Sequence, residues 1–276
     1  MTNGQVVVGI DGSAAAEAAI KWAAAEAASR GAELKLVHAF AWPLFTVPLG
    51  ASDTAPGLRA AANKIVQDSI ELAKKFEPAV AVGGLRRNGF PSPVLIKAST
   101  EADLIVIGSR GLGVMLGAMV GSTSLDLVAN AHCPVVVVRP DLAGDPGRRV
   151  VVGYDGSSAS SIALDFGIDY ARRHRLELRV VAAQPLATDE VGITHHDLEA
   201  EVHGREGGQD AELVQISGHP AAHLLRLSAD ANLIVLGSRG RGGFAGMLLG
   251  SVSQTVLHHA DCPVAVIPAA AIGGST

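Results

Sequence analysis

The sequence predicts an α/β protein built from two tandem doubly wound parallel sheets, each with five strands in the order 3-2-1-4-5. Two observations predict this fold. The segment Val6–Ser13 recurs as Val150–Ser157, and Asp103–Gly111 recurs with few changes as Asn232–Gly240. Within each copy, short Val- and Ile-rich runs alternate with longer helical patterns, as expected when helices connect parallel strands. The chain is therefore a duplication of one α/β unit.

The length of 276 residues fits two domains, at roughly 100–200 residues per domain. We expect the first domain over residues 1–140 and the second over residues 149–270, joined by the polar, Pro- and Gly-containing linker Arg139–Gly147. The second copy is 15 residues shorter than the first within the stretch 183–218, which corresponds to 39–89 in the first copy.

Five strands are expected in the first copy because each is a short aliphatic run bounded by Gly, Pro or polar residues. They are Val6–Ile10, Glu33–Ala39, Ala79–Leu85, Leu104–Ile107 and Pro134–Val138. The ends of the two copies, Val135–Val138 and Val264–Ile267, are Val-rich sheet edges. Exposed apolar edges pair with another strand, so we expect these two to find a partner.

Four helices are expected between these strands. Ser13 can cap the first, Gly31 ends it, and the third begins with a proline, whose missing N–H costs nothing in a first turn. In the second copy the second helix, around Asp197–His203, is expected to be short. The four helices of the first copy are Ala14–Ser29, Leu58–Phe76, Pro91–Ser99 and Ser122–Ala131.

Composition excludes several classes of protein. Hydrophobic residues make up 48% of the chain and charged residues 18%, which is enough apolar material for a packed core and excludes disorder as the main state. A net charge of -5 without a basic run lacks the electrostatic footprint of a nucleic-acid binder. The 2 cysteines, Cys133 and Cys262, occupy equivalent positions in the two copies, which predicts buried small side chains and no mutual disulfide.

The N-terminal segment Met1–Gln5 has no basic region typical of a signal peptide, and every apolar stretch is well under the ~18 residues of a membrane-spanning helix. We expect no membrane insertion and a cytoplasmic location, with free thiols in a reducing compartment. The histidines invite a metal hypothesis, since His219 and His223 have i, i+4 spacing, but no acidic residue completes a metal-binding pattern. Surface or helix-end roles are the preferred interpretation for them.

Glycines recur in register after the fourth strand of each copy. Without a Cβ, such residues let backbone N–H groups approach an anion closely, and the helix that follows adds free N–H donors and a partial positive charge. The pattern is therefore typical of a phosphate-binding loop, although a single glycine loop is more often only a turn. It is neither a Walker A loop nor the Rossmann dinucleotide fingerprint. The two copies of the pattern read Gly108-x2-Gly111-x9-Gly121-Ser122 and Gly237-x2-Gly240-x9-Gly250-Ser251.

Asp11 and Asp155 end the first strand of each copy, next to the expected position of the fourth strand. In a doubly wound sheet this is the point where the crossovers diverge and where ligands bind. The carboxylate can accept hydrogen bonds from a ribose or a base, or it can close the turn that begins the next helix. Arg110 and Arg239 can contact an anion or remain solvated loop charges.

The doubled G-x2-G-x9-G-[S/T] pattern, together with the Asp after the first strand and the Val-rich last strand, resembles the universal stress protein family. The resemblance covers Gln5–Pro140 and Arg149–Pro268 and is greatest to the tandem, two-domain, ATP-binding members common in actinobacteria. It implies a Rossmann-like fold of the HUP type in each half. It also implies that the last strands pair with each other, so that the two halves pack as a pseudo-two-fold dimer.

The resemblance further implies ATP as the ligand, with Mg²⁺ on its phosphates, and one site in each half. One departure is Val252, which stands where the first copy has Thr123 and keeps a backbone donor but no hydroxyl. The first site would comprise Gly9, Ile10, Asp11, Ala39, Gly108, Arg110, Gly111, Gly121, Ser122, Thr123 and Ser124. The second would comprise Gly153, Tyr154, Asp155, Ala183, Gly237, Arg239, Gly240, Gly250, Ser251, Val252 and Ser253.

The expected function is a regulatory or sensor protein of a stress or dormancy response that binds ATP and is not an enzyme. The alternative is a slow ATP hydrolase or nucleotide-transfer enzyme on the same fold, and a third class is a scaffold with vestigial sites. Binding is preferred because efficient hydrolysis needs a positioned base or a water-orienting carboxylate beside the phosphates, and the loop offers Ser, Thr, Gly and Arg. A homodimer and an unidentified regulatory protein are the expected partners.

Overall fold

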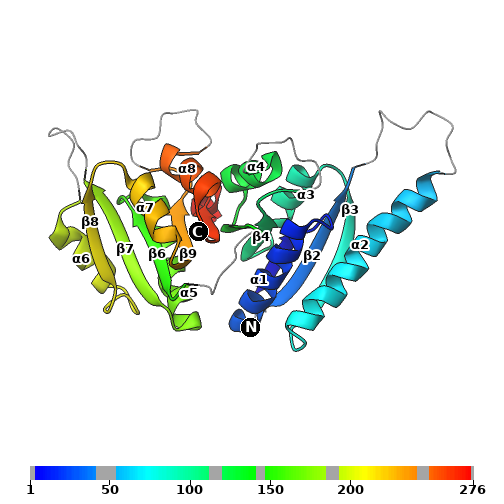
Figure 1. Ribbon diagram of the computed structural model, residues 1–276, viewed down its shortest axis with the longest axis horizontal. Coiled ribbons are helices and arrows are strands. Elements are labelled where there is room, and N and C mark those ends of the chain that lie inside the picture. The colour runs from blue at the N-terminus through cyan, green and yellow to red at the C-terminus, as the bar shows by residue number, and fades with distance from the viewer. Residues whose placement is uncertain are drawn as a thin grey trace. The chain divides into compact units, whose positions relative to one another are not determined.

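A computed structural model describes residues 4–41, 54–111, 120–140, 147–184, 193–240 and 249–274. The chain divides into two compact units (Figure 1). Unit 1 comprises the chain up to Leu127 together with Val138–Pro140, and unit 2 comprises Val128–Val137 and the chain from residue 141 onward. Most of the predicted linker, residues 141–146, lies outside the described residues.

Unit 1 contains a parallel sheet with the order β3-β2-β1-β4. Its helices cover both faces, because Leu95 of α3 packs against Gly9 on one face while Val66 and Ile70 of α2 pack against Gly84 on the other. Figure 1 shows α1 beside β2 and α2 beside β3. The elements are β1 Gln5–Gly9, α1 Ala14–Arg30, β2 Glu33–Phe40, α2 Thr54–Phe76, β3 Val82–Asn88, α3 Pro91–Ala98, β4 Leu104–Gly108 and α4 Ser122–Asn130, whose last residues belong to unit 2.

Unit 2 contains the strand order β5-β10-β9-β6-β7-β8. All neighbours pair in parallel except β5 and β10, which pair antiparallel with Val264 opposite Val137. The elements are β5 Val135–Val138, whose last residue belongs to unit 1, β6 Arg149–Tyr154, α5 Ser158–His174, β7 Glu177–Gln184, α6 His195–His203, β8 Glu212–Ser217, α7 Pro220–Ser228, β9 Ala231–Gly237, α8 Ser251–His259, β10 Val264–Ile267 and the 3₁₀ helix η1 Ala269–Gly274.

The predicted α/β class and strand order are confirmed. The second copy has the full order 3-2-1-4-5, and unit 1 shows its first four strands in the same order. The antiparallel pairing of β5 with β10 also agrees with the expectation that the Val-rich last strands find each other. The packing of the two halves about a pseudo-two-fold axis stays a prediction.

The first helix of each copy is capped as its sequence indicates. The Ser13 hydroxyl accepts a hydrogen bond from the Ala16 N–H at 3.2 Å, and the Ser157 hydroxyl accepts one from the Ser160 N–H at 3.2 Å. Each bond satisfies one of the N–H groups that a helix start leaves open. Gly31 ends α1 with a φ of 63°, a left-handed conformation that glycine adopts at little cost.

Two elements of the first copy differ from the prediction by more than one residue. The strand expected at 79–85 is β3, Val82–Asn88, because Val80 lies in the turn after α2 and the strand continues through two arginines and an asparagine. Edge strands carry such polar residues, so a prediction from hydrophobicity alone sets the bounds of β3 too early in the sequence. The second helix of the first copy begins at Thr54, whereas its counterpart α6 is only 9 residues long, as expected from the shortened second copy.

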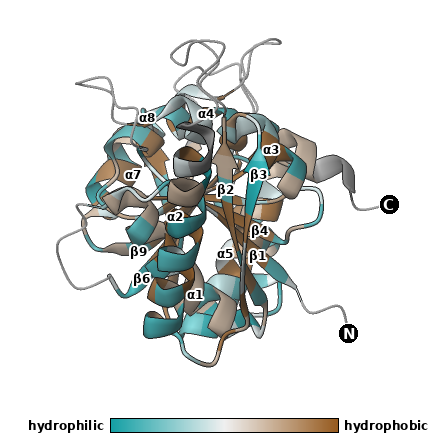
Figure 2. Cartoon of the chain, turned by 90° about the vertical axis from the view of Figure 1, so that its right-hand side faces the viewer, coloured by the Kyte–Doolittle hydropathy of each residue, from teal (hydrophilic) through white to brown (hydrophobic). Residues whose placement is uncertain are grey.

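The core of each unit lies between the central strands and the helices. Val6, Val7 and Val8 are fully buried, as are Val150 and Val152. In Figure 2 the brown, hydrophobic colour gathers on strands such as β1 and β4, while α2 carries hydrophilic residues. This is the pattern of a parallel sheet covered on both faces.

Candidate functional site

Asp11 and Gly111 lie against each other at the carboxyl ends of β1 and β4, which are neighbouring parallel strands. A Cβ added at Gly111 would collide with Oδ2 of Asp11. Unit 2 repeats the arrangement, since a Cβ at Gly240 would collide with Oδ2 of Asp155. The structure therefore brings together the aspartate and the second loop glycine in both copies, as the sequence predicts.

The same aspartates also close the turn before the first helix. Oδ1 of Asp11 accepts a hydrogen bond from the Ser13 N–H at 3.0 Å, and Oδ1 of Asp155 accepts one from the Ser157 N–H at 3.0 Å. Gly12, between Asp11 and Ser13, has a φ of 80°, which only glycine adopts readily. In both copies Oδ1 thus closes the turn, whereas Oδ2 faces the glycine loop.

The first glycine of each loop is required by helix packing. A Cβ at Gly108 would approach the backbone of Ala15 in α1 to 2.6 Å, and one at Gly237 would approach the Cβ of Ala159 in α5 to 2.8 Å. These glycines let the first turn of the helix lie directly on the strand end. Gly121 and Gly250 are less crowded, because a Cβ there would meet its nearest atom at 3.7 Å or 3.5 Å.

The two ends of each loop are joined through a buried serine that sequence reasoning missed. Ser109 donates its N–H to Val138 at 2.7 Å and accepts from the Gly121 N–H at 2.8 Å. Ser238 makes the equivalent bonds in unit 2, to Ile267 and from Gly250, both at 2.8 Å. Both serine hydroxyls are fully buried and lack a hydrogen-bond partner in the described structure. The signal was present in the sequence, since both copies read Gly-Ser-Arg-Gly.

The serines of the following helix divide into two kinds. Ser124 is buried, and its hydroxyl donates to the Gly108 carbonyl at 3.1 Å, while Ser253 donates to the Gly237 carbonyl at 2.7 Å. Their hydrogens therefore hold the helix onto the strand end. Ser122 and Ser251 begin the helices and are exposed. No side chain caps the start of α8 within the described residues, so its first N–H groups can donate hydrogen bonds to an anion.

Comparison with known proteins bears on this repeated arrangement. A family model described as the universal stress protein family matches residues 2–139 and 147–268. The chain belongs to the universal stress protein family. Universal stress protein Rv2005c of Mycobacterium tuberculosis is 36% identical and covers 95% of this chain and 96% of its own length. Universal stress protein Rv1996 of the same species is 34% identical, with coverage of 96% and 95%.

Solved structures of universal stress proteins share the fold. One from Archaeoglobus fulgidus DSM 4304 superposes with a TM-score of 0.76 at 22% identity and covers 96% of each chain. A putative one from Pseudomonas aeruginosa UCBPP-PA14 gives a TM-score of 0.64 at 17% identity, with coverage of 98% of this chain and 95% of that chain. These likenesses extend over both copies of the duplicated unit.

The two copies of this universal stress protein differ beside the aspartate. Ile10 is buried, and its carbonyl accepts a hydrogen bond from Nδ1 of His38 at 2.8 Å. Tyr154 takes the place of Ile10 in the second copy and is also buried. Burial, followed by the charge and hydrogen bond of the Glu201 carboxylate, raises the pKa of Tyr154 to about 12. Its hydroxyl is therefore neutral near pH 7.

The remaining predicted residues flank this edge of each sheet. Gly9 and Gly153 have no room for a Cβ, because Leu95 and Leu236 pack against them. Ala39 and Ala183 lie near the ends of β2 and β7, while Arg110 and Arg239 follow Ser109 and Ser238 in the two loops. Thr123 and Val252 are each the second residue of a helix and are half-buried.

Neither a metal cluster nor a membrane-spanning helix is found in the described parts of the universal stress protein. The described histidines, cysteines and carboxylates form no group of three or more that could hold a metal ion. No described helix is long and apolar enough to cross a bilayer. Cys133 and Cys262 are buried free thiols, as predicted, and burial raises the pKa of Cys262 to about 12.

Proposed function

We propose that this universal stress protein binds ATP, one molecule in each repeat, and acts as a regulatory or sensor protein in a stress or dormancy response. The observation that carries the proposal is the contact between Asp11 and Gly111, repeated by Asp155 and Gly240. It puts a carboxylate oxygen and a glycine loop side by side at the edge where open parallel sheets bind ligands.

In the first repeat we assign the ribose to Oδ2 of Asp11 and the adenine to the edge formed by Ala39. The phosphates would lie on the backbone N–H groups of Gly111 and of the first turn of α4, with the exposed Ser122 hydroxyl and Thr123 as further donors. Arg110 would supply a positive charge from the loop. Ser124 acts indirectly, because its hydroxyl already binds the Gly108 carbonyl.

Mg²⁺ would accompany the phosphates. The described side chains form no group of three metal ligands, so the phosphate oxygens and water would supply most of its coordination. The donor set fits ATP, since it combines small residues, backbone N–H groups and hydroxyls.

In the second repeat the same roles fall to Asp155, Gly240 and Ser251. Val252 offers only its N–H where Thr123 also has a hydroxyl, so we expect weaker phosphate binding there. The predicted domains, 1–140 and 149–270, would each form one complete site. The proposal also includes a homodimer, an unidentified regulatory protein partner and a cytoplasmic location.

Isothermal titration of the full chain with Mg-ATP tests the proposal. We expect two bound nucleotides per chain, and one after Asp11→Asn, which keeps the shape of the side chain but removes its charge. Asp68→Asn, at an exposed position of α2, is the matched control and should leave two sites. Failure to bind any adenine nucleotide would refute the proposal. Continuous release of phosphate over many turnovers would favour the alternative, a slow ATP hydrolase.

A further inference from the structure

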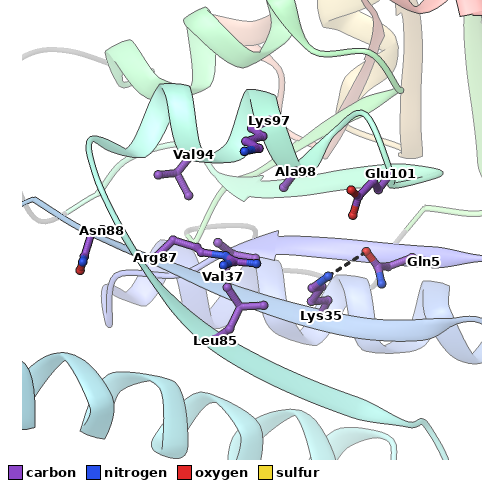
Figure 3. A pocket seen from close by; sticks show the side chains of 10 residues that line it. All are labelled: Gln5, Lys35, Val37, Leu85, Arg87, Asn88, Val94, Lys97, Ala98 and Glu101. Carbon is purple, nitrogen blue, oxygen red and sulfur yellow. Dashed lines mark hydrogen bonds between the residues drawn. The ribbon is translucent and has the colours of Figure 1, made fainter.

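A cavity of about 270 Å³ lies between α3 and the sheet of unit 1 (Figure 3). Side chains of β1, β2 and β3 line one side of the cavity. Side chains of α3, together with Glu101, line the opposite side. Figure 3 shows Lys97 and Glu101 across the cavity from Arg87, Lys35 and Gln5. The lining residues are Gln5, Lys35, Val37, Leu85, Arg87, Asn88, Val94, Lys97, Ala98 and Glu101.

The charged groups of this cavity are unbalanced. Three cations, Lys35, Arg87 and Lys97, line it with one carboxylate, Glu101, which leaves two positive charges in excess. Lys35 is half-buried, and its Nζ is 3.5 Å from the amide oxygen of Gln5. Within the described structure, none of the three cations forms an ion pair with a carboxylate. Like charges that line one cavity repel one another, and a bound anion would relieve this repulsion.

The second repeat provides an internal comparison. Arg179 corresponds to Lys35, but it is paired with Glu212, whose position in the first repeat is Gly83. The Nε of Arg179 lies 2.8 Å from the Glu212 carboxylate. At the position of Arg87 the second repeat has Ile216. The second repeat thus neutralises this region with its own side chains, whereas the first leaves it positive.

We propose that the α3 cavity of unit 1 binds a small organic phosphate. A phosphate monoester carries a charge of about −1.5 to −2 at pH 7, which matches the excess of two positive charges. The planar guanidinium of Arg87 and the ammonium groups of the two lysines are the side chains best suited to phosphate oxygens. The apolar wall of Val37, Leu85, Val94 and Ala98 would contact the carbon part of the ligand.

This cavity is separate from the proposed ATP site. Gln5 and Lys35 lie in the first halves of β1 and β2, whereas Asp11 and Gly111 follow the carboxyl ends of their strands. The two regions approach each other at Val37, which pairs in register with Gly9, and at Arg87, which pairs in register with Ala39. Binding in the cavity therefore does not depend on the proposed function.

Titration of the ATP-saturated full chain with phenyl phosphate, and separately with inorganic phosphate, tests the proposal. We expect saturable binding of one phenyl phosphate per chain and weaker binding of inorganic phosphate, which cannot contact the apolar wall. Lys97→Gln should weaken phenyl phosphate binding about tenfold, the effect of losing one charge-assisted hydrogen bond. Gly83→Glu, which introduces the carboxylate of the second repeat, should weaken it as strongly.

The matched control is Arg226→Gln, at the position of Lys97 in the second repeat, and it should leave the affinity unchanged. Far-ultraviolet circular dichroism and thermal melting of each variant check that the fold is intact. Equal loss in Lys97→Gln and Arg226→Gln, equal affinity for both probes, or no binding to the ATP-saturated chain would each overturn the proposal. Loss of ATP affinity in folded Lys97→Gln would instead make the cavity part of the nucleotide site and would also overturn it.

Discussion

The Glu201 carboxylate of α6 lies close enough to the buried Tyr154 hydroxyl, at the end of β6, for its negative charge to raise the pKa of that hydroxyl. Glu201 also pairs with Arg205, whose Nε lies 2.7 Å from Asp165 in α5. A nine-residue helix contributes little stability by itself, because helix formation needs tertiary contacts. The polar contacts to α5 and the buried side chains of Leu198 and Val202 therefore together hold the short α6 in place.

Replacing this carboxylate should change the titration of Tyr154. In Glu201→Gln the negative charge disappears, so the pKa of Tyr154 should fall from about 12 toward its ordinary value of 10.0, although burial still raises it. Ultraviolet detection of tyrosinate in a Tyr170→Phe background measures this directly. Glu199→Gln, on the same helix, is the control, and an equal shift in that variant would contradict the assignment.

The same network should make unit 2 sensitive to acid. The Arg205 hydrogen bond lowers the pKa of Glu201 below its ordinary value of 4.5. A carboxylate with a lowered pKa in the folded state stabilises the fold above its unfolded pKa, and this contribution disappears as pH falls through the folded value. Urea unfolding below pH 4.5 should therefore show a smaller acid-induced loss of stability in Glu201→Gln than in the wild type. Parallel curves for the two proteins would argue against the network.

Gly111→Ala should remove one of the two proposed ATP sites. The new Cβ would collide with Oδ2 of Asp11, so the carboxylate must move away from the ribose position. We expect titration with Mg-ATP to give one site per chain, and none after the further change Gly240→Ala. Two sites of unchanged affinity in the double variant would be incompatible with the proposed roles of the aspartates.

Gly108→Ala should reduce stability more than Gly121→Ala. At residue 108 the added methyl group meets the backbone of α1, which can give way only if the helix shifts, whereas at residue 121 the nearest atom is 3.7 Å away. Overpacking of this kind costs about 1–3 kcal/mol. Chemical denaturation of both variants measures the difference, and equal stability would show that α1 does not press on the strand end.

Ser13→Ala should lose the N-cap of α1, at a cost of about 1 kcal/mol in the free energy of unfolding. Ser157→Ala should cost more, because the Ser157 hydroxyl also donates to Oδ1 of Asp155 at 2.6 Å. Urea unfolding of the two variants compares these costs. A smaller loss in Ser157→Ala would mean that the extra hydrogen bond has no net effect.

Local patterns predicted the order of elements well, because the features that set it lie close together in sequence. Buried parallel strands are aliphatic runs, and Ser13 and Gly31 mark the ends of α1 without help from distant residues. The polar edge strand β3 was misplaced because its pairing with β2, and not its hydrophobicity, determines where it begins. Local sequence contains little information about where an edge strand begins to pair with its neighbour.

The sequence indicates which residues of the candidate site lie together. It does not indicate the packing contacts and hydrogen bonds that each of them makes. The expected strand order, with the first strand beside the fourth, placed Asp11 next to the glycine loop, yet the crowding of Gly108 against Ala15 appears only when α1 is packed. Likewise, the sequence does not show that the Ser124 hydroxyl donates a hydrogen bond to the Gly108 carbonyl at the end of β4. The link between Tyr154 and Glu201 joins residues far apart in the chain, so no spacing rule could indicate it.

The hydrogen bond from the Gly121 N–H to Ser109 closes the base of the glycine loop, and Ser109 is itself held by Val138 in the last strand. A loop whose two stems are tied to each other and to the sheet can change in length or composition beyond the tie without disturbing the strands below. Unit 2 has the same closure at Ser238 and Gly250. Within one protein, each repeat is therefore free to acquire its own loop sequence on an unchanged frame.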